Sequence, residues 1–154
     1  MAFDNNSLDL IFAYSVFSHL AEPVALAWIK EFARVLKPNG ILLATTQDRS
    51  FLDYCKSLQD TKDELEFGWH KALAKSFMPI EDAKRDYDNG YFLYSATGGG
   101  GPRDKSFYGE ALIPPKYIEE EYTPFLTLRD FQGGPQRRLP QALFVMQKPL
   151  GSEF

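Results

Sequence analysis

His19 is the residue whose type and position best suit chemistry in this chain of 154 residues. It follows a mostly apolar run at 8–17, which predicts a strand covered on both faces within a parallel sheet. Open α/β sheets bind their ligands at the carboxyl ends of such strands. A histidine placed there can serve as a general base near neutral pH. The alternative is a loop histidine that makes only a structural hydrogen bond.

Other nucleophilic or metal-binding residue types are few. His70 lies in a predicted helix beside Trp69, which favours a partly buried structural histidine over a base. Cys55 is the only cysteine, and its place on an apolar helical stripe predicts a core residue that is not a nucleophile. A single cysteine excludes an internal disulfide and fits a reducing compartment. Two histidines and one cysteine give no clustered ligand set, so we expect no metal site.

A glycine-rich run and a pair of arginines could be taken for ligand-binding motifs. The four glycines at 98–101 lack the Lys-Ser/Thr ending of a phosphate-binding loop and do not join a strand to a helix. We expect a hinge there, in a lid over a binding site. Arg137 and Arg138 form a short basic pair in a predicted hairpin connection, where we expect both side chains to be exposed.

A strand-helix-strand unit would position His19. Glu22 and Pro23 open a helix whose apolar stripe is Trp28, Ile29, Phe32, Val35 and Leu36. The sequence Pro38-Asn39-Gly40 ends it, with residues suited to a left-handed turn. A second buried strand follows at 41–46, and such crossovers are almost always right-handed.

The middle of the chain is predicted to be helical. Helices are expected at 49–59, at 64–77 and at 81–87, and the second would carry Leu65, Trp69, Ala72, Leu73 and Phe77 on one face. We interpret residues from about 60 to about 110 as an insertion that forms a helical lid.

Composition limits the class of protein. The length allows one domain, over residues 1–150, that buries a real core. A formal net charge of −4 gives no general attraction to nucleic acid or to an anionic membrane surface. No apolar run is long enough to predict a membrane span. We therefore expect a soluble, cytoplasmic protein.

Residues 4–46 resemble one part of a known family. They read DNNSLDLIFAYSVFSHLAEPVALAWIKEFARVLKPNGILLATT. This resembles the fourth strand, the following helix and the fifth strand of class I, Rossmann-like S-adenosylmethionine-dependent methyltransferases, although Asn39 stands where that family usually has glycine. The motif YGEA at 108–111 resembles a loop leading to the sixth strand, and the runs at 125–131 and 142–149 resemble the closing antiparallel hairpin.

The resemblance implies roles for particular residues. Tyr14, Ser15 and Val16 would lie beside the methionine portion of the cofactor. His19, Tyr108 and Glu110 would lie near a small-molecule acceptor, with His19 or Glu110 as candidates for a catalytic base. Methyl transfer from a sulfonium needs alignment, and a base if the acceptor is a hydroxyl or an amine.

The resemblance also implies a missing piece. In the family, a strand followed by a G-x-G-x-G turn holds most of the cofactor, and no such turn occurs here between a strand and a helix. We therefore expect a C-terminal portion of a methyltransferase that alone binds no S-adenosylmethionine and is inactive. Two alternatives stay open: a non-catalytic module that dimerises, or a half-enzyme that joins a separate N-terminal chain. The tail at 151–154 would be a cloning remnant or a frayed native end.

Strand order and assembly follow from the same comparison. The resembled fold is an α/β sheet of two parallel strands and the hairpin, in the spatial order first, second, fourth, third. The free edge of strand 8–17 contains no Lys or Pro, and Asp9 is its only charge. We expect a homodimer through antiparallel pairing of two such strands, with Ile11, Ala13 or their neighbours as an apolar patch.

Overall fold

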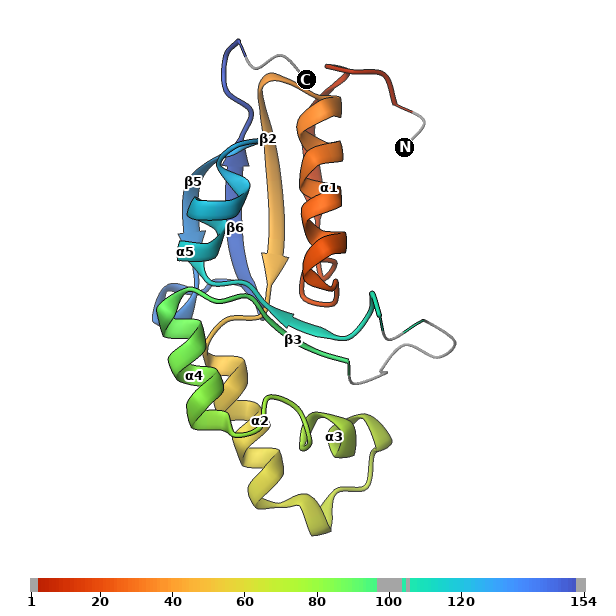
Figure 1. Cartoon of the computed structure of the whole chain (residues 1–154), viewed down its shortest axis with the longest axis vertical. Coiled ribbons are helices and arrows are strands. Elements are labelled where there is room, and N and C mark those ends of the chain that lie inside the picture. The colour runs from red at the N-terminus through yellow and green to blue at the C-terminus, as the bar shows by residue number, and fades with distance from the viewer. Residues whose placement is uncertain (1–2, 97–103, 105, 152–154) are drawn as a thin grey trace.

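A four-stranded mixed sheet forms the centre of the computed structural model, which describes residues 3–96, 104 and 106–151. Its strand order is β1-β2-β6-β5 (Figure 1). The strands are β1 (Leu8–Ala13), β2 (Leu36–Thr46), β5 (Thr127–Gln132) and β6 (Ala142–Gln147). β1 and β2 are parallel, whereas β6 is antiparallel to both of its neighbours. The predicted α/β class, mixed sheet and strand order are confirmed.

The helix α1 (Glu22–Val35) connects the two parallel strands. Pro23 lies in its first turn, where the missing N–H costs no hydrogen bond, and Ile29 and Phe32 lie on its buried side. The helix passes directly into β2 at Leu36, ahead of the predicted turn. Asn39 adopts a φ of 66°, and asparagine is among the few residues besides glycine that tolerate this left-handed conformation. That tolerance explains how asparagine can replace the glycine usual in the resembled family.

One face of the sheet carries the main core. Side chains of α1 and of residues 113–126 pack against Leu42, Phe144 and Met146 of the central strands. Ala13 is buried in this core, and Ile11 packs against it. The exposed apolar patch therefore falls on their neighbours in β1 and not on these two residues.

The opposite face of the sheet is apolar and open in the described part of the chain. Phe12 pairs in register with Leu43, and Leu43 pairs with Val145, so these three side chains share that face. Phe12 is 61% exposed and Leu10 is 56% exposed. Isolated exposed apolar residues are common, but a contiguous group along one strand marks a contact surface.

A helical part lies between β2 and β3 in the chain and at the end of the molecule away from both termini (Figure 1). It contains α2 (Ser50–Asp60), the short 3-10 helix η1 (Lys62–Glu64), α3 (Gly68–Leu73) and α4 (Ile80–Asn89). The predictions at 49–59 and 81–87 agree with α2 and α4. The long helix predicted at 64–77 is wrong, because only α3 forms there. Phe77 takes a left-handed φ of 55°, which a helix cannot contain, and Trp69 is exposed instead of facing a core.

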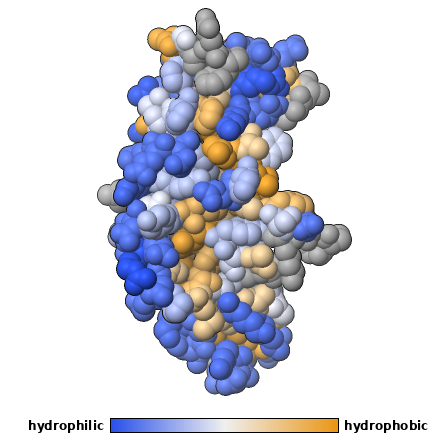
Figure 2. Space-filling view, in the orientation of Figure 1, coloured by the Kyte–Doolittle hydropathy of each residue, from blue (hydrophilic) through white to orange (hydrophobic). Residues whose placement is uncertain are grey.

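A small sheet connects the two parts. β3 (Leu93–Ser95) and β4 (Glu110–Leu112) pair in antiparallel fashion, so the motif at 108–111 is partly a strand and not only a loop. Figure 2 shows apolar residues gathered across the middle of the visible face, at the level of β3, between more hydrophilic ends. The chain then passes through α5 (Pro115–Tyr117) and the π-helical turn η2 (Ile118–Tyr122) to β5, and the 3-10 helix η3 (Gly134–Gln136) precedes β6. None of the helices described here is long and apolar enough to cross a membrane.

Candidate active site

The loop after β1 presents Ser15 and His19 at the carboxyl ends of the parallel strands. β1 ends at Ala13, earlier than predicted, because Ser15 adopts a left-handed φ of 55° and turns the chain. The Ser15 N–H donates to Thr45 Oγ1 at 2.8 Å, which ties the turn to the end of β2. Phe17 is fully buried and anchors the loop in the core. Non-glycine residues in this conformation store strain and are concentrated at functional sites.

The His19 ring is held in one orientation. Its Nδ1 lies 2.9 Å from the carbonyl oxygen of Gly109. Since a carbonyl only accepts, Nδ1 is the donor in this contact, which leaves Nε2 as the nitrogen that can accept a proton when the ring is neutral. Nε2 lies 3.5 Å from Ser15 Oγ. The Tyr108 ring stacks on the imidazole, with centroids 5.1 Å apart and an interplanar angle of 17°.

Backbone pairing brings Tyr108 and Glu110 to His19. The Gly109 N–H donates to the His19 carbonyl at 2.9 Å, and the Ala111 N–H donates to the Ser18 carbonyl at 2.8 Å. Residues on either side of Gly109 are therefore fixed beside the loop after β1. The three predicted acceptor-side residues, His19, Tyr108 and Glu110, lie together.

Gln141 and Thr45 complete the cluster, and sequence reasoning missed both. Gln141 Oε1 accepts from Thr45 Oγ1 at 2.7 Å, while Gln141 Nε2 donates to Ser15 Oγ at 3.1 Å and to Ser18 Oγ at 3.2 Å. Because Ser15 Oγ accepts from Gln141, its own proton is free to point toward His19 Nε2. The only signal in the sequence was the place of Thr45 at the carboxyl end of a buried strand.

Glu110 lies on the Nδ1 side of His19. Its Oε2 is 3.6 Å from His19 Nδ1 and is buried without a hydrogen-bond partner in the described structure. Burial raises the pKa of Glu110 from 4.5 to about 7, against the opposing effect of a hydrogen bond with the Gln47 side chain. The carboxyl group can therefore gain or lose a proton near neutral pH.

The three residues predicted at the cofactor do not all join this cluster. Ser15 belongs to it, whereas Tyr14 and Val16 are 44% and 38% exposed. The ring of Tyr14 lies 6.3 Å from that of Phe12 on the exposed part of β1. The Val16 carbonyl accepts from the His19 N–H at 3.0 Å, but neither side chain hydrogen-bonds to the His19 cluster in the described structure.

A cavity of about 430 Å³ opens beside the cluster. Its walls are Gln47, Ser50, Phe51, Tyr54, Arg137, Pro140 and Gln141. Gln141 also bonds to Ser15, and Gln47 also bonds to Glu110, so the cavity and the cluster share two side chains. This volume suits a small molecule.

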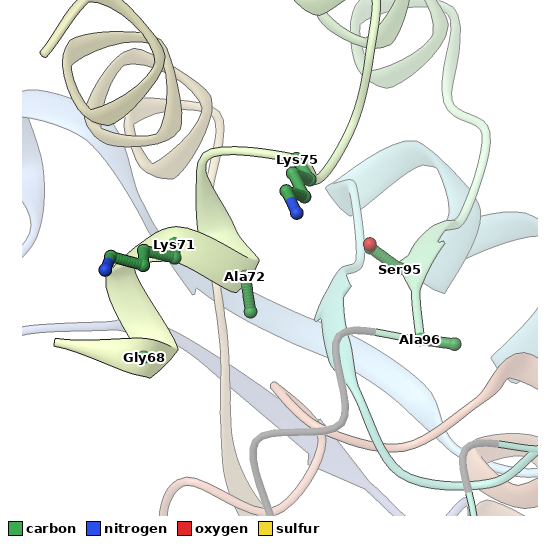
Figure 3. A pocket seen from close by; sticks show the side chains of 6 residues that line it. All are labelled: Gly68, Lys71, Ala72, Lys75, Ser95 and Ala96. Atoms are coloured by element: carbon green, nitrogen blue, oxygen red, sulfur yellow. The ribbon is translucent and has the colours of Figure 1, made fainter. Parts of the chain in front are cut away.

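A second cavity, of about 380 Å³, lies between α3 and β3. Figure 3 shows Lys71 and Lys75, from α3 and the turn after it, with Ser95 and Ala96 on the opposite wall. No residue of the His19 cluster lines this cavity, and no described carboxylate or histidine faces its lysines from the lining.

The other residues considered for chemistry, His70 and Cys55, have packed or buried side chains. His70 packs among aromatic rings, with its centroid 3.8 Å from that of Trp69. Cys55 is fully buried, and burial raises the pKa of its thiol to about 12, which leaves it unreactive. The glycines at 98–101 lie outside the described residues. Within the described ranges, no group of three or more His, Cys, Asp and Glu side chains is arranged to hold a metal ion.

Arg137 is exposed, as predicted, and its guanidinium also makes side-chain contacts. Its Nη1 donates to Ser50 Oγ at 3.2 Å and lies 3.6 Å from the buried Asp48 carboxylate. These contacts hold Arg137 in the wall of the larger cavity.

Comparison with known proteins finds similarity to methyltransferases. Residues 1–44 match the family model described as "Methyltransferase domain", a match that covers β1, the His19 loop, α1 and most of β2. No curated protein sequence is similar enough to count as a relative.

Two solved structures are similar over nearly the whole chain. An S-adenosylmethionine-dependent methyltransferase from Methanosarcina mazei has 15% identity and a TM-score of 0.51, over 97% of this chain and 63% of that one. A chain of the Haloferax volcanii complex that contains the Trm112 methyltransferase activator has 18% identity and a TM-score of 0.36, over 97% of this chain and 57% of that one. The second score is too low to support an argument. The chain thus spans about 63% of the length of the first structure, and its fold is that of a Rossmann-like methyltransferase.

Proposed function

We propose that this chain carries the acceptor side of an S-adenosylmethionine-dependent methyltransferase for a small molecule, with His19 as the general base. One observation carries the proposal. His19 Nε2, which lies 3.5 Å from Ser15 Oγ, stands at the carboxyl end of β1, beside a cavity of small-molecule size, in a methyltransferase-like fold. The single, buried thiol of Cys55 is compatible with a cytoplasmic location.

The residues of the cluster have different roles in the proposed reaction. S-Adenosylmethionine, when bound, would supply a sulfonium methyl group: the acceptor oxygen or nitrogen bonds to the methyl carbon in line, and the C–S bond breaks with its electron pair leaving on sulfur. His19 Nε2 takes the proton that the acceptor hydroxyl or amine loses. The Gly109 carbonyl holds the ring through Nδ1, and charged Glu110 stabilises the imidazolium that results.

The described residues fit one end of the cofactor and not the other. The turn at 14–16 offers backbone polar groups and the Ser15 hydroxyl beside His19, which suits the methionine portion. No glycine-rich turn between a strand and a helix is present in the described part to receive the adenosine. Loss of several hydrogen bonds, at roughly 1 kcal/mol each, moves a micromolar affinity toward the millimolar range. The chain by itself is therefore proposed to be inactive, and the adenosine contacts would have to come from residues outside those described here.

The edge of β1 favours a second proposal, a homodimer. β1 pairs only with β2 among the described strands and so lies at the edge of the sheet. Asp9 is the only charge on the strand, and its carboxylate is bound by Lys37 Nζ at 2.8 Å. Two copies of β1 can pair in antiparallel fashion about a two-fold axis and form a continuous eight-stranded sheet. Such a dimer can exist without catalysis, as an interaction module.

The histidine ring signals test the proposed function. The chain contains two histidines, so ¹⁵N NMR of the imidazole rings reports His19 and His70 separately. Because the chain alone is expected to bind S-adenosylmethionine no more tightly than the millimolar range, the cofactor is added to about 10 mM, where it should shift the His19 ring signals and leave those of His70 unchanged. The variant Ser15→Ala should weaken the His19 response. A response at His70 alone, or at neither ring, would contradict the proposal.

A further inference from the structure

We infer that the cavity beside the His19 cluster, with walls formed by α2, Arg137 and Gln141, binds a small acceptor that carries an anionic group, with Arg137 as its counter-ion. This inference rests on the proposed function for the position of the methyl acceptor. The cavity itself stands on its own geometry and can be tested without the cofactor.

The charge of the cavity lining favours an anionic ligand. Arg137 is the only charged side chain among the seven residues that line the cavity. The rest of the lining consists of two amides, one hydroxyl, two aromatic rings and a proline. A ligand in this space meets one positive charge and no negative one from its walls.

Preorganisation of Arg137 is the second argument. Asp48, only 2% exposed, already accepts from the Ser50 N–H at 2.9 Å, the Ser50 hydroxyl and the Gly134 N–H at 2.8 Å. Asp48 is thus satisfied without Arg137, whose Nη1 lies at 3.6 Å and donates to Ser50 Oγ instead. The Nε and Nη2 groups of Arg137 have no partner among the described residues. This edge of a guanidinium is a planar fork that matches a carboxylate.

The shape and position of the cavity favour a flat ligand that reaches toward His19. The rings of Phe51 and Tyr54, with centroids 6.0 Å apart, form an apolar wall suited to a flat or aromatic body. Gln141 lies in the same lining and bonds to Ser15, next to His19 Nε2. An anionic group on Arg137 would therefore leave the other end of the ligand facing the base. The acceptor class is a small, flat carboxylate with a hydroxyl or an amine to be methylated.

Benzoate and its neutral amide, benzamide, are suitable probes of the anion site. Each is titrated into the ¹⁵N-labelled chain, and backbone amide shifts are followed. Benzoate should shift the amides of Gln47, Phe51 and Gln141. Benzamide should bind at least about tenfold more weakly than benzoate, a factor worth about 1.4 kcal/mol. Arg137→Gln should reduce benzoate affinity by about tenfold and leave benzamide unchanged. Arg138→Gln, which removes the same charge from the next residue, should change benzoate affinity less than about twofold.

Two further variants keep the test decisive if Arg137→Gln unfolds the cavity. Arg137→Lys keeps the charge but not the fork, and should retain part of the preference for benzoate over benzamide. Tyr54→Ala should weaken both probes to a similar extent. Equal binding of the two probes, equal losses in the Arg137 and Arg138 variants, or no shifts at the cavity would overturn the inference. Failure here with an intact response of His19 to S-adenosylmethionine would leave the proposed function standing, and the reverse pattern would leave only an anion site.

Discussion

Glu110 is the residue whose proton equilibrium changes most at the candidate site. Burial raises its pKa from 4.5 to about 7, so the native state keeps a proton that the unfolded chain releases near pH 4.5. The native state therefore binds more protons between these values, and its stability must fall as the pH rises from about 4.5 to about 7. This direction is the reverse of that for a carboxylate stabilised by an ion pair.

The variant Glu110→Gln removes this dependence. Relative to the variant, wild-type stability should decline by at most roughly 3 kcal/mol across that interval and stay level on either side. Urea unfolding of both proteins at pH 4.5, 6 and 7.5 measures the difference. A difference that stays constant with pH would contradict the assignment of Glu110 as a buried carboxyl group.

Some residues of the site could be predicted from the sequence and others could not. His19 follows a strand, which is enough to place it at a ligand-binding edge. Gln141 has no motif, and it is 126 residues from its partner Ser15, so only the folded hairpin brings the two together. The guanidinium of Arg137 was likewise unpredictable, because its contact with Asp48 spans 89 positions and depends on how η3 packs.

At the scale of elements, the β3–β4 pair holds the site through Gly109. A Cβ atom on Gly109 would collide with the Ser95 backbone carbonyl and come within 2.9 Å of the Tyr94 ring. Gly109→Ala must therefore push β3 away or break the Gly109 bonds to His19, and should cost about 1–3 kcal/mol of stability. Gly68→Ala is the matched control, because a Cβ there meets nothing within 4 Å. It should be neutral or stabilising by up to about 1 kcal/mol, as judged by urea unfolding at one pH. A tolerated Gly109→Ala that leaves the His19 ring signals unchanged would show that this approach does not fix the site.

Elements with a strong local pattern were predicted well, and those without one were not. The βαβ unit has mostly apolar strands and a clear helical stripe, so β1, α1 and β2 were predicted, although β1 ends earlier and β2 begins earlier than predicted. Residues 64–77 show helical spacing too, but the backbone turns at Phe77 and Trp69 stays exposed. The spacing of apolar residues in that segment is therefore not enough to predict a helix. The packing of Leu65 and Leu73 with Leu58 determines the backbone conformation instead.

At the scale of the whole molecule, the edge and face of β1 that the described residues leave exposed are where the proposed homodimer would form. Phe12→Lys places a charge on the exposed row formed with Leu43 and Val145, and natural edge strands use lysine in this way to prevent pairing. We expect the wild type to sediment as a dimer at micromolar concentration and Phe12→Lys as a monomer. Met78→Lys is the control, because Met78 is 66% exposed and lies outside the sheet. Ile11→Lys is less informative, since Ile11 packs against the core. A wild type that is monomeric at micromolar concentration would refute the dimer.

The central proposal is that this chain holds the methionine and acceptor side of a methyltransferase site, and that its described residues do not form the adenosine side. Titration of the ¹⁵N-labelled chain with S-adenosylmethionine, up to about 10 mM and followed at each backbone amide, tests both halves of that claim in one experiment. The account predicts shifts centred on Tyr14, Ser15, Val16 and His19, with a dissociation constant in the millimolar range. Saturation at tens of micromolar would show that the chain already forms a complete cofactor site. Shifts confined to other parts of the molecule would show that the loop after β1 is not the site at all.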